Sequence, residues 1–313
     1  MEKKRFIQRY PSFCIFAVLA VLLVLVAVFA PQLSRGVNPI KGSLKESIMP
    51  PSAEHPFGTD KMGRDIFVRV LYGARTSLSS TFILVAVVFV IGSFLGILAG
   101  YFGGWVDAVI MRVADMMIAF PGLVLAIAVA GILAGYFGGW VDAVIMRVAD
   151  MMIAFPGLVL AIAVAGILGA STRNAIIAIA VVTWPKYARL ARSLVMKIRN
   201  TDFVAAATVT GSTTPYMLWK YMLPNTITTL VITAATDIGG MMMELAALSF
   251  LGFGAQPPTP EWGSMLNEGR NFMQSAPWLM RYPGLAIFVT VVVFNMLGDG
   301  LRDILDPRSG EGR

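Results

Sequence analysis

Long stretches without a charged residue alternate along this chain with shorter polar segments. The charge-free windows are residues 10–34, 76–106, 116–141, 151–172, 221–236 and 282–298, with a shorter one at 174–185. A helix needs roughly 20 apolar residues to cross a bilayer, and the first four windows meet that length. The pattern therefore predicts an all-α fold, a polytopic bundle of transmembrane helices.

Composition agrees with the hydrophobic pattern. Hydrophobic residues make up 57% of the chain and charged residues 14%, whereas soluble domains carry about 25% charged residues. The net charge of +7 is consistent with basic loops that face anionic headgroups. Basic and aromatic residues do not interleave, so we expect no nucleic-acid partner. Cys14 is the one cysteine of the sequence, which excludes an intrachain disulfide.

The first window is interpreted as an uncleaved membrane helix. Its apolar run is long, and Pro31 directly after Phe29 and Ala30 disfavours signal-peptide cleavage there. Residues 1–75 are then an N-terminal span with an extracytoplasmic segment, and residues 76–313 are the transmembrane domain. Oppositely charged pairs four residues apart predict a surface helix over residues 59–75.

An identical 35-residue repeat occurs twice in tandem, as residues 96–130 and 131–165. Solenoid repeats are degenerate, number at least three and stack on one another. Two identical copies instead indicate a recent duplication or an error in the determined sequence. Each copy contributes one hydrophobic segment, so the duplication adds one potential crossing to a core of six spans.

Charge distribution favours the six-span count. With six spans, the two termini and the loop near residue 210 share one side of the membrane. That side would hold the basic residues at both ends and around the loop, as the distribution of Lys and Arg in cytoplasmic segments requires. These residues are Lys3, Lys4, Arg5, Arg9, Lys186, Arg189, Arg192, Lys197, Arg199, Lys220, Arg302 and Arg308. We therefore expect cytoplasmic termini, and one repeat copy that does not form an ordinary crossing.

A polar segment at residues 199–224 interrupts this apolar chain. It holds three small residues, Ala205, Ala206 and Ala207, then Gly211, and finally Leu223 and Pro224. Small residues form a flat face, Gly211 permits a turn with positive φ, and Pro224 is typical of a helix boundary. A short helix, a turn and a second helix outside the bilayer predict a docking element, so function would run through a partner.

Two acidic residues stand in an otherwise apolar span. Asp237 and Glu244 are seven residues apart and share a helix face. An acid inside a span is a candidate for the translocation path, because exposing it to lipid is costly. The alternative is that Glu244 lies at the outer interface and pairs with a neighbouring helix.

The 201–224 segment resembles the coupling loop of ABC-transporter permeases, the "EAA" loop. Ala205, Ala206, Ala207, Gly211, Leu223 and Pro224 fall on its positions, with Ala205 at the usual Glu and Tyr221 at the usual Ile. Three further stretches resemble the C-type permease subunit of the peptide/nickel (dipeptide/oligopeptide) branch. They are residues 57–66 with 72–78, residues 248–263 and residues 294–307.

The resemblance implies a permease of an ATP-driven importer for di- or oligopeptides, or for nickel, in a prokaryotic inner membrane. A second homologous permease, two cytosolic ATPases and an extracytoplasmic substrate-binding protein are the implied partners. The chain itself lacks a Gly-x-x-x-x-Gly-Lys-Ser/Thr loop. We therefore expect no bound cofactor, with ATP held by the partner subunits.

Two other function classes fit the sequence less well. A channel or secondary carrier would work without an ATPase, and inverted repeats would favour it, whereas the repeat here is direct. An intramembrane enzyme is disfavoured because the chain has one histidine and neither a His-Glu-x-x-His nor a Gly-x-Ser-x-Gly motif. The sequence thus predicts no catalytic residue and no metal site.

Overall fold

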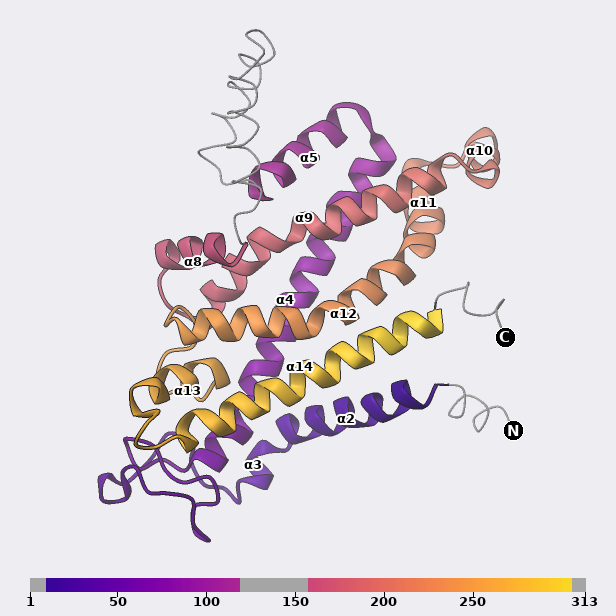
Figure 1. Cartoon of the computed structure of the whole chain (residues 1–313). Coiled ribbons are helices and arrows are strands. Elements are labelled where there is room, and N and C mark those ends of the chain that lie inside the picture. The colour runs from indigo at the N-terminus through magenta and orange to yellow at the C-terminus, as the bar shows by residue number, and fades with distance from the viewer. Residues whose placement is uncertain (1–9, 119–156, 306–313) are drawn as a thin grey trace, which may run out of the picture. The chain divides into compact units, whose positions relative to one another are not determined.

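The computed structural model describes residues 10–118 and 157–305 of the chain (Figure 1). Its helices are α2 (Pro11–Val28), α3 (Ala30–Leu33), α4 (Ile66–Phe102), α5 (Gly104–Ile118), α8 (Gly157–Leu168), α9 (Thr172–Arg199), α10 (Asp202–Val209), α11 (Thr214–Met217), α12 (Leu223–Phe250), α13 (Trp262–Gly269) and α14 (Trp278–Leu305). Within these two ranges the extended pairing is an isolated bridge between Thr59 and Asp65. The all-α prediction is confirmed for the described residues.

Four helical runs in the described ranges are long and apolar enough to cross a membrane. They are Pro11–Val28, Ile66–Phe102, Thr214–Phe250 and Trp278–Leu305. α8 has 12 residues, about 18 Å at 1.5 Å per residue, which is too short to cross a hydrocarbon core of about 30 Å. A polytopic membrane bundle is supported to this extent. Most of the second repeat copy lies outside the described residues, so the count of six spans stays a prediction.

The contacts divide the chain into two compact units. Unit 1 comprises Met1–Ala86, Ala165–Ile177 and Val231–Arg313, and unit 2 comprises Val87–Val164 and Ala178–Leu230. Both units contain parts of the long helices α4, α9 and α12. The expected division into residues 1–75 and 76–313 stays a prediction.

In unit 1, α2 packs antiparallel against α14 (Figure 1). The start of α2 meets the end of α14, because a Cβ on Gly300 would lie 3.0 Å from the Cβ of Phe13. α12 also approaches α14 closely, since a Cβ on Gly298 would lie 2.6 Å from the Cα of Thr236. Small residues permit such close packing of apolar helices. The first and last described helices therefore have their chain ends on the same side of unit 1.

The segment before α4 differs from the predicted surface helix over residues 59–75, which is wrong in its first part. The helix begins at Ile66, and Asp60 holds a turn by accepting hydrogen bonds from the backbone of Met62 at 2.8 Å and Arg64 at 3.0 Å. Asp residues favour such local turns over helix starts. Gly63, with φ of +69°, closes the turn.

In unit 2, three glycines of α4 form a seam against α9. A Cβ on Gly96 would lie 2.2 Å from the carbonyl oxygen of Ala188, and Gly92 and Gly100 are similarly close to α9. Their spacing of four residues places them on one helix face. The repeated Gly-x-x-x-Gly pattern in the sequence is the known signal for close packing of membrane helices.

Candidate functional site: a helical hairpin at the end of α9

The polar 199–224 segment folds as a helical hairpin. α10 follows α9, and Gly211, with φ of +82°, ends α10 before α11 begins. The amide of Gly211 donates to Thr208 O and that of Ser212 to Ala207 O, each at 3.1 Å. This pair of bonds satisfies two of the last α10 carbonyls, and it requires a left-handed residue at the position of Gly211. The predicted short helix, glycine turn and second helix are all present.

The buried side of the hairpin packs into a small apolar core in unit 2. From the hairpin, Val204, Ala207, Met217 and Met222 enter this core, where they meet residues of α4, α9 and α12. The partners from those three helices are Ile97, Ala191, Val195 and Leu230. The hairpin is thus attached through packed side chains to the helices that flank it.

The opposite side of the hairpin exposes apolar and aromatic side chains. Val209 is 88% exposed and Trp219 is 75% exposed, and Phe203 and Tyr216 are each about half exposed. Ala205 and Ala206 lie on the exposed side, whereas Ala207 is buried. The flat small-residue face is therefore made by two of the three predicted alanines. The aromatic residues were not included in the predicted docking element, although aromatic side chains in a segment outside the predicted spans can indicate an interaction surface.

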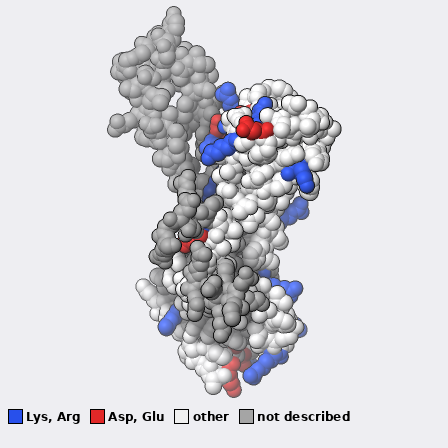
Figure 2. All heavy atoms as spheres, turned by 90° about the vertical axis from the view of Figure 1, so that its right-hand side faces the viewer, with Lys and Arg blue, Asp and Glu red and all other residues white. Residues whose placement is uncertain are grey.

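Charged residues stand beside these apolar side chains. Asp202 and Lys220 of the hairpin are exposed, and Figure 2 shows Lys, Arg and acidic side chains in small groups among mostly uncharged residues. An exposed apolar area with a polar rim is typical of a protein interaction site. The surface formed by Phe203, Val209, Tyr216 and Trp219, with Ala205 and Ala206 beside them, is called the hairpin surface below.

Pro224 is the second residue of α12, where the helix boundary was predicted, but the chain does not leave helical geometry before it. One helical run continues from Thr214 to Phe250, and residues 218–222 form a π-helical turn directly before Pro224. A proline lacks the amide hydrogen and crowds the preceding turn, and the wider π turn accommodates both effects. Asn225 also donates its side-chain amide to Tyr221 O at 2.7 Å. Leu223 lies half-buried beside this turn.

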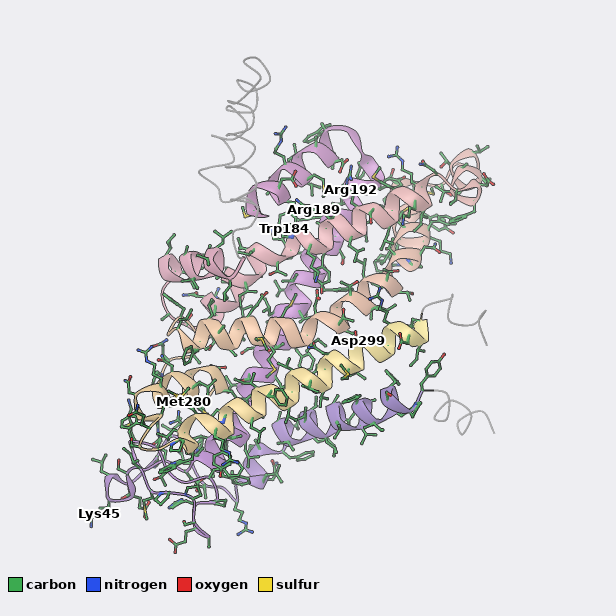
Figure 3. All side chains as sticks on the ribbon, viewed as in Figure 1. Lys45, Trp184, Arg189, Arg192, Met280 and Asp299 are labelled. Carbon is green, nitrogen blue, oxygen red and sulfur yellow. The ribbon has the colours of Figure 1, made fainter. Side chains whose placement is uncertain are left out.

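Two ion pairs connect α9, the helix that leads into the hairpin, with α5. Arg192 forms a bidentate pair with Asp107, with 2.5 Å between Nη2 and Oδ2, and Arg189 pairs with Asp115. Both arginines lie on the α5 side of α9 (Figure 3). Two of the basic residues that were assigned to the cytoplasmic flank therefore also hold helices together.

The two acids of α12 lie in unit 1. Asp237 is half-buried and Glu244 is exposed, and they share a helix face, as predicted from their spacing. α12 and α14 approach closely near Asp237, since a Cβ on Gly239 would lie 2.1 Å from Oδ1 of Asn295.

A buried charge cluster in unit 1 joins the turn before α4 to α13, where the sequence predicted a surface helix. The guanidinium of Arg64 contacts Asp60 Oδ2 at 2.6 Å through Nε and Glu268 Oε2 at 2.8 Å through Nη2. Arg69 contacts the same two carboxylates. Both arginine side chains are 1% exposed. We refer to Asp60, Arg64, Arg69 and Glu268 as the outer charge cluster, which ties the turn before α4 to α13.

Glu261 begins α13 in a buried position. Its carboxylate accepts bonds from the backbone of Gly263 at 2.9 Å and Ser264 at 2.8 Å, and Ser77 Oγ donates to it at 3.1 Å. Burial raises the pKa of the Glu261 carboxyl above its usual range, and these hydrogen bonds oppose the rise only in part. This residue was not singled out as a helix cap from the sequence.

Several apolar spans and a helical hairpin with an exposed apolar surface define a multi-pass membrane protein built to bind a partner. Comparisons with known proteins give the class. Residues 127–311 match the family described as the binding-protein-dependent transport system inner membrane component. The chain therefore belongs to this family, the permease subunits of ABC importers. It is a multi-pass transport component of the inner membrane rather than an enzyme.

Relatives align along most of the chain. It is 40% identical over 289 residues to a dipeptide transport system permease of Alkalihalophilus pseudofirmus, covering 91% of this chain and 82% of the relative. It is 38% identical over 294 residues to a probable D,D-dipeptide transport system permease of Escherichia coli, covering 94% and 87%. It is 40% identical over 258 residues to a glutathione transport system permease of Pectobacterium atrosepticum, covering 82% and 74%.

Proposed function

We propose that this chain is the permease subunit of an ATP-driven importer of small peptides. The relatives named above are permeases of dipeptide, D,D-dipeptide and glutathione systems, and all three substrates contain amide-linked amino acids. Their names favour peptides over the nickel alternative. A second permease, two ATPases and a substrate-binding protein complete the machine, with ATP on the ATPases and no cofactor on this chain.

The hairpin surface is where the ATPase docks, and this assignment rests on one observation. The hairpin exposes apolar and aromatic residues on one side while its other side is packed into the core between α4, α9 and α12. A push on the surface is therefore delivered to those helices as a rigid displacement, since packed cores deform little. Gly211 sets the angle of the hairpin, and the termini lie on the same cytoplasmic side.

Substitution of Gly211 tests the coupling assignment. Gly211→Arg places a large side chain at positive φ on the hairpin, and we expect it to abolish the stimulated ATPase activity of the assembled complex. Gly36→Arg is the matched control, because Gly36 also has positive φ and open space around it but lies outside unit 2. Stimulation that survives in Gly211→Arg, with the protein inserted normally, would show that the hairpin is not the coupling element.

The peptide assignment has a separate test. Purified substrate-binding protein from the same system is titrated with di- and tripeptides and with nickel chelates, and uptake of the tight ligand is then followed in vesicles that contain the complete complex. Peptide binding and peptide uptake support the proposal. Tight nickel binding without a response to peptides would exclude it.

We further propose six spans, with α5 and α8 forming the third crossing together. Their contacts along α9 support a single antiparallel register. Asp115 of α5 pairs with Arg189, and a Cβ on Gly157 of α8 would lie 3.3 Å from Val182. On α9, Val182 precedes Arg189 by seven residues. When the 35 residues of one repeat are subtracted, Gly157 likewise follows Asp115 by seven residues. The described helices thus use the first part of one copy and the last part of the other.

Removal of one repeat tests this architecture. Deleting residues 119–153 joins Ile118 to the sequence Ala-Phe-Pro-Gly, which is also the sequence that follows Ile118 in the full chain. Three residues bridge up to about 14 Å, comparable with the roughly 10 Å that separates Arg189 from Val182 along α9. We expect the shortened protein to insert, assemble and transport at least as well as the full chain.

One outcome of the deletion experiment would contradict the six-span proposal. If the shortened protein fails to insert while the full chain transports, both copies contribute crossings and the six-span architecture is wrong. Accessibility of a cysteine placed at the exposed Thr213 in both forms then reports which side the hairpin occupies. An extracytoplasmic hairpin in the full chain would also contradict the proposal.

Asp237 and Glu244 are proposed to line the translocation path. Peptides carry a terminal amino group, for which a carboxylate inside a span is a suitable partner. Asp237→Asn should lower the uptake rate of a dipeptide and leave ATPase docking unchanged. Glu244→Gln should do so less, because Glu244 is the more exposed of the two.

A further inference from the structure

A groove opens on unit 1 between α2 and α4, and none of its lining residues belongs to the outer charge cluster. Its volume is about 280 Å³, close to the lower end of ligand-sized pockets, which is roughly 300 Å³. The apolar part is formed by Val24 and Val28 of α2 and by Leu78 and Phe82 of α4. Each pair is one helical turn apart, so the apolar residues form a strip along both helices.

Arg75 stands at one end of this strip. It lines the groove together with Ser79, and the charge-free window of α4 begins directly after it, at residue 76. The apolar strip then runs from Leu78 to Phe82, deeper into the spanning part of α4. An arginine at the boundary of an apolar window is at the level of lipid headgroups.

Arg75 differs from the two arginines before it, Arg64 and Arg69, in its ion pairing. Arg64 and Arg69 are buried and paired with carboxylates. Arg75 is exposed, and among residues 10–118 and 157–305 no carboxylate forms an ion pair with it. Ser79 donates its hydroxyl to Thr76 O at 3.1 Å, which leaves the guanidinium as the donor at this end of the groove.

We propose that the groove binds one glycerophospholipid. Its phosphate is held by the Arg75 guanidinium, and one acyl chain lies along Val24, Val28, Leu78 and Phe82. Arginine presents parallel N–H groups that match phosphate oxygens, and such charge-assisted bonds are about twice as strong as neutral ones. The amphipathic lining, with a cation at one end and methyl and phenyl groups at the other, matches the two parts of this lipid.

Lipid titration of the purified complex tests the site. The complex is delipidated in detergent, titrated with phosphatidylglycerol and examined by native mass spectrometry. Arg75→Gln should weaken the tightest lipid site about ten-fold, since one hydrogen bond to a charged group is worth at least that factor. Arg75→Lys should recover part of the affinity. Val28→Trp, which fills the groove but leaves the charge, should also weaken binding.

Controls separate this site from general lipid attraction. Arg281→Gln removes an exposed arginine at the start of α14 that does not line the groove, and it should leave the affinity unchanged. Diacylglycerol with the same acyl chains should bind poorly because it lacks the phosphate. Unfolding temperatures of all variants confirm that they are folded.

Three outcomes would overturn the proposal. Equal losses in Arg75→Gln and Arg281→Gln would mean that surface charge alone attracts the lipid. Equal affinity for diacylglycerol would mean that the guanidinium has no role. A cross-link from position 28 to the second permease, with no lipid retained, would mean that a protein surface covers the groove.

Discussion

The outer charge cluster of unit 1 buries charged side chains, whereas the hairpin of unit 2 exposes apolar ones. The outer charge cluster places four ionised groups out of solvent and ties a turn to α13 through them. The hairpin leaves Val209 and Trp219 in solvent although both are apolar. Buried charges held in ion pairs restrain the geometry of the segments that carry them, whereas exposed apolar groups gain free energy only when a partner covers them.

The difference distinguishes a region that stabilises the fold from a region that is suited to binding a partner. In the outer charge cluster, removing one charged side chain leaves its partner buried without a counter-charge, so the folded protein becomes less stable. On the hairpin surface, losing one side chain removes little from the folded chain, so the cost falls on the assembled complex. Stability and coupling should therefore respond to different residues, and the following variants test that separation.

Asp60→Ala should produce the largest effect on stability. Asp60 contacts both arginines of the cluster and two backbone amides, and breaking a buried pair costs about 3–5 kcal/mol because a charge stays buried without its partner. Asp115→Ala is the control, because the Asp115–Arg189 pair is about half exposed and exposed pairs contribute about 0–1 kcal/mol. Thermal unfolding in detergent compares the two, and equal losses would remove the distinction between buried and exposed pairs.

Trp219→Ala should leave stability nearly unchanged and weaken coupling strongly. Aromatic residues at the centre of an interface often contribute about 2 kcal/mol or more, which corresponds to roughly a thirty-fold change in an equilibrium constant. Trp105→Ala is a matched control, since Trp105 on α5 is 76% exposed and Trp219 is 75% exposed. Affinity of the ATPase for the permease and stimulated ATPase activity are the measurements. A similar loss in both variants would mean that the hairpin surface has no special role.

Some features of both regions were predictable because they depend on local chemistry. A glycine with small residues before it predicts a left-handed turn, and Gly211 has φ of +82°. The start of α4 was not predictable in the same way. Asp60 and Arg64 have helical spacing, but the partner that fixes their geometry is Glu268, about 200 residues later in the chain. Such a contact has no local signal, and propensity yields to tertiary structure there.

Pro224 shows a different limit of sequence reasoning. The rule that proline interrupts a helix is sound for the backbone, but the π turn at residues 218–222 accommodates the proline and the helix continues.

The exposed aromatic residues of the hairpin are a third case. Their exposure depends on how α10 and α11 turn about Gly211, and composition alone does not report which side of a short helix faces the core.

Gly96→Ala tests the seam that supports the hairpin core. A Cβ at Gly96 would lie 2.2 Å from Ala188 O, whereas a Cβ at Gly240 of α12 would meet no atom within 4 Å. Overpacking costs about 1–3 kcal/mol, and alanine in an open helical position gains about 0.5–1 kcal/mol over glycine. Gly96→Ala should therefore lower the unfolding temperature and Gly240→Ala should raise it slightly. Opposite signs are the expected result, and equal shifts would show that α4 and α9 are not in close contact.

Glu261 should give the smallest effect, and one that depends on pH. Burial raises its pKa in the folded protein, so the folded state binds a proton more tightly than the unfolded state does. The contribution of this group to stability is then full below the ordinary glutamate value and is lost as pH rises through the raised folded value. Glu261→Gln keeps one acceptor for the α13 amides and removes the titration, so its unfolding temperature should change less over that interval. An unfolding temperature of the wild-type chain that rises with pH there, relative to Glu261→Gln, would contradict the raised pKa and leave the carboxylate as an ordinary charged cap of α13.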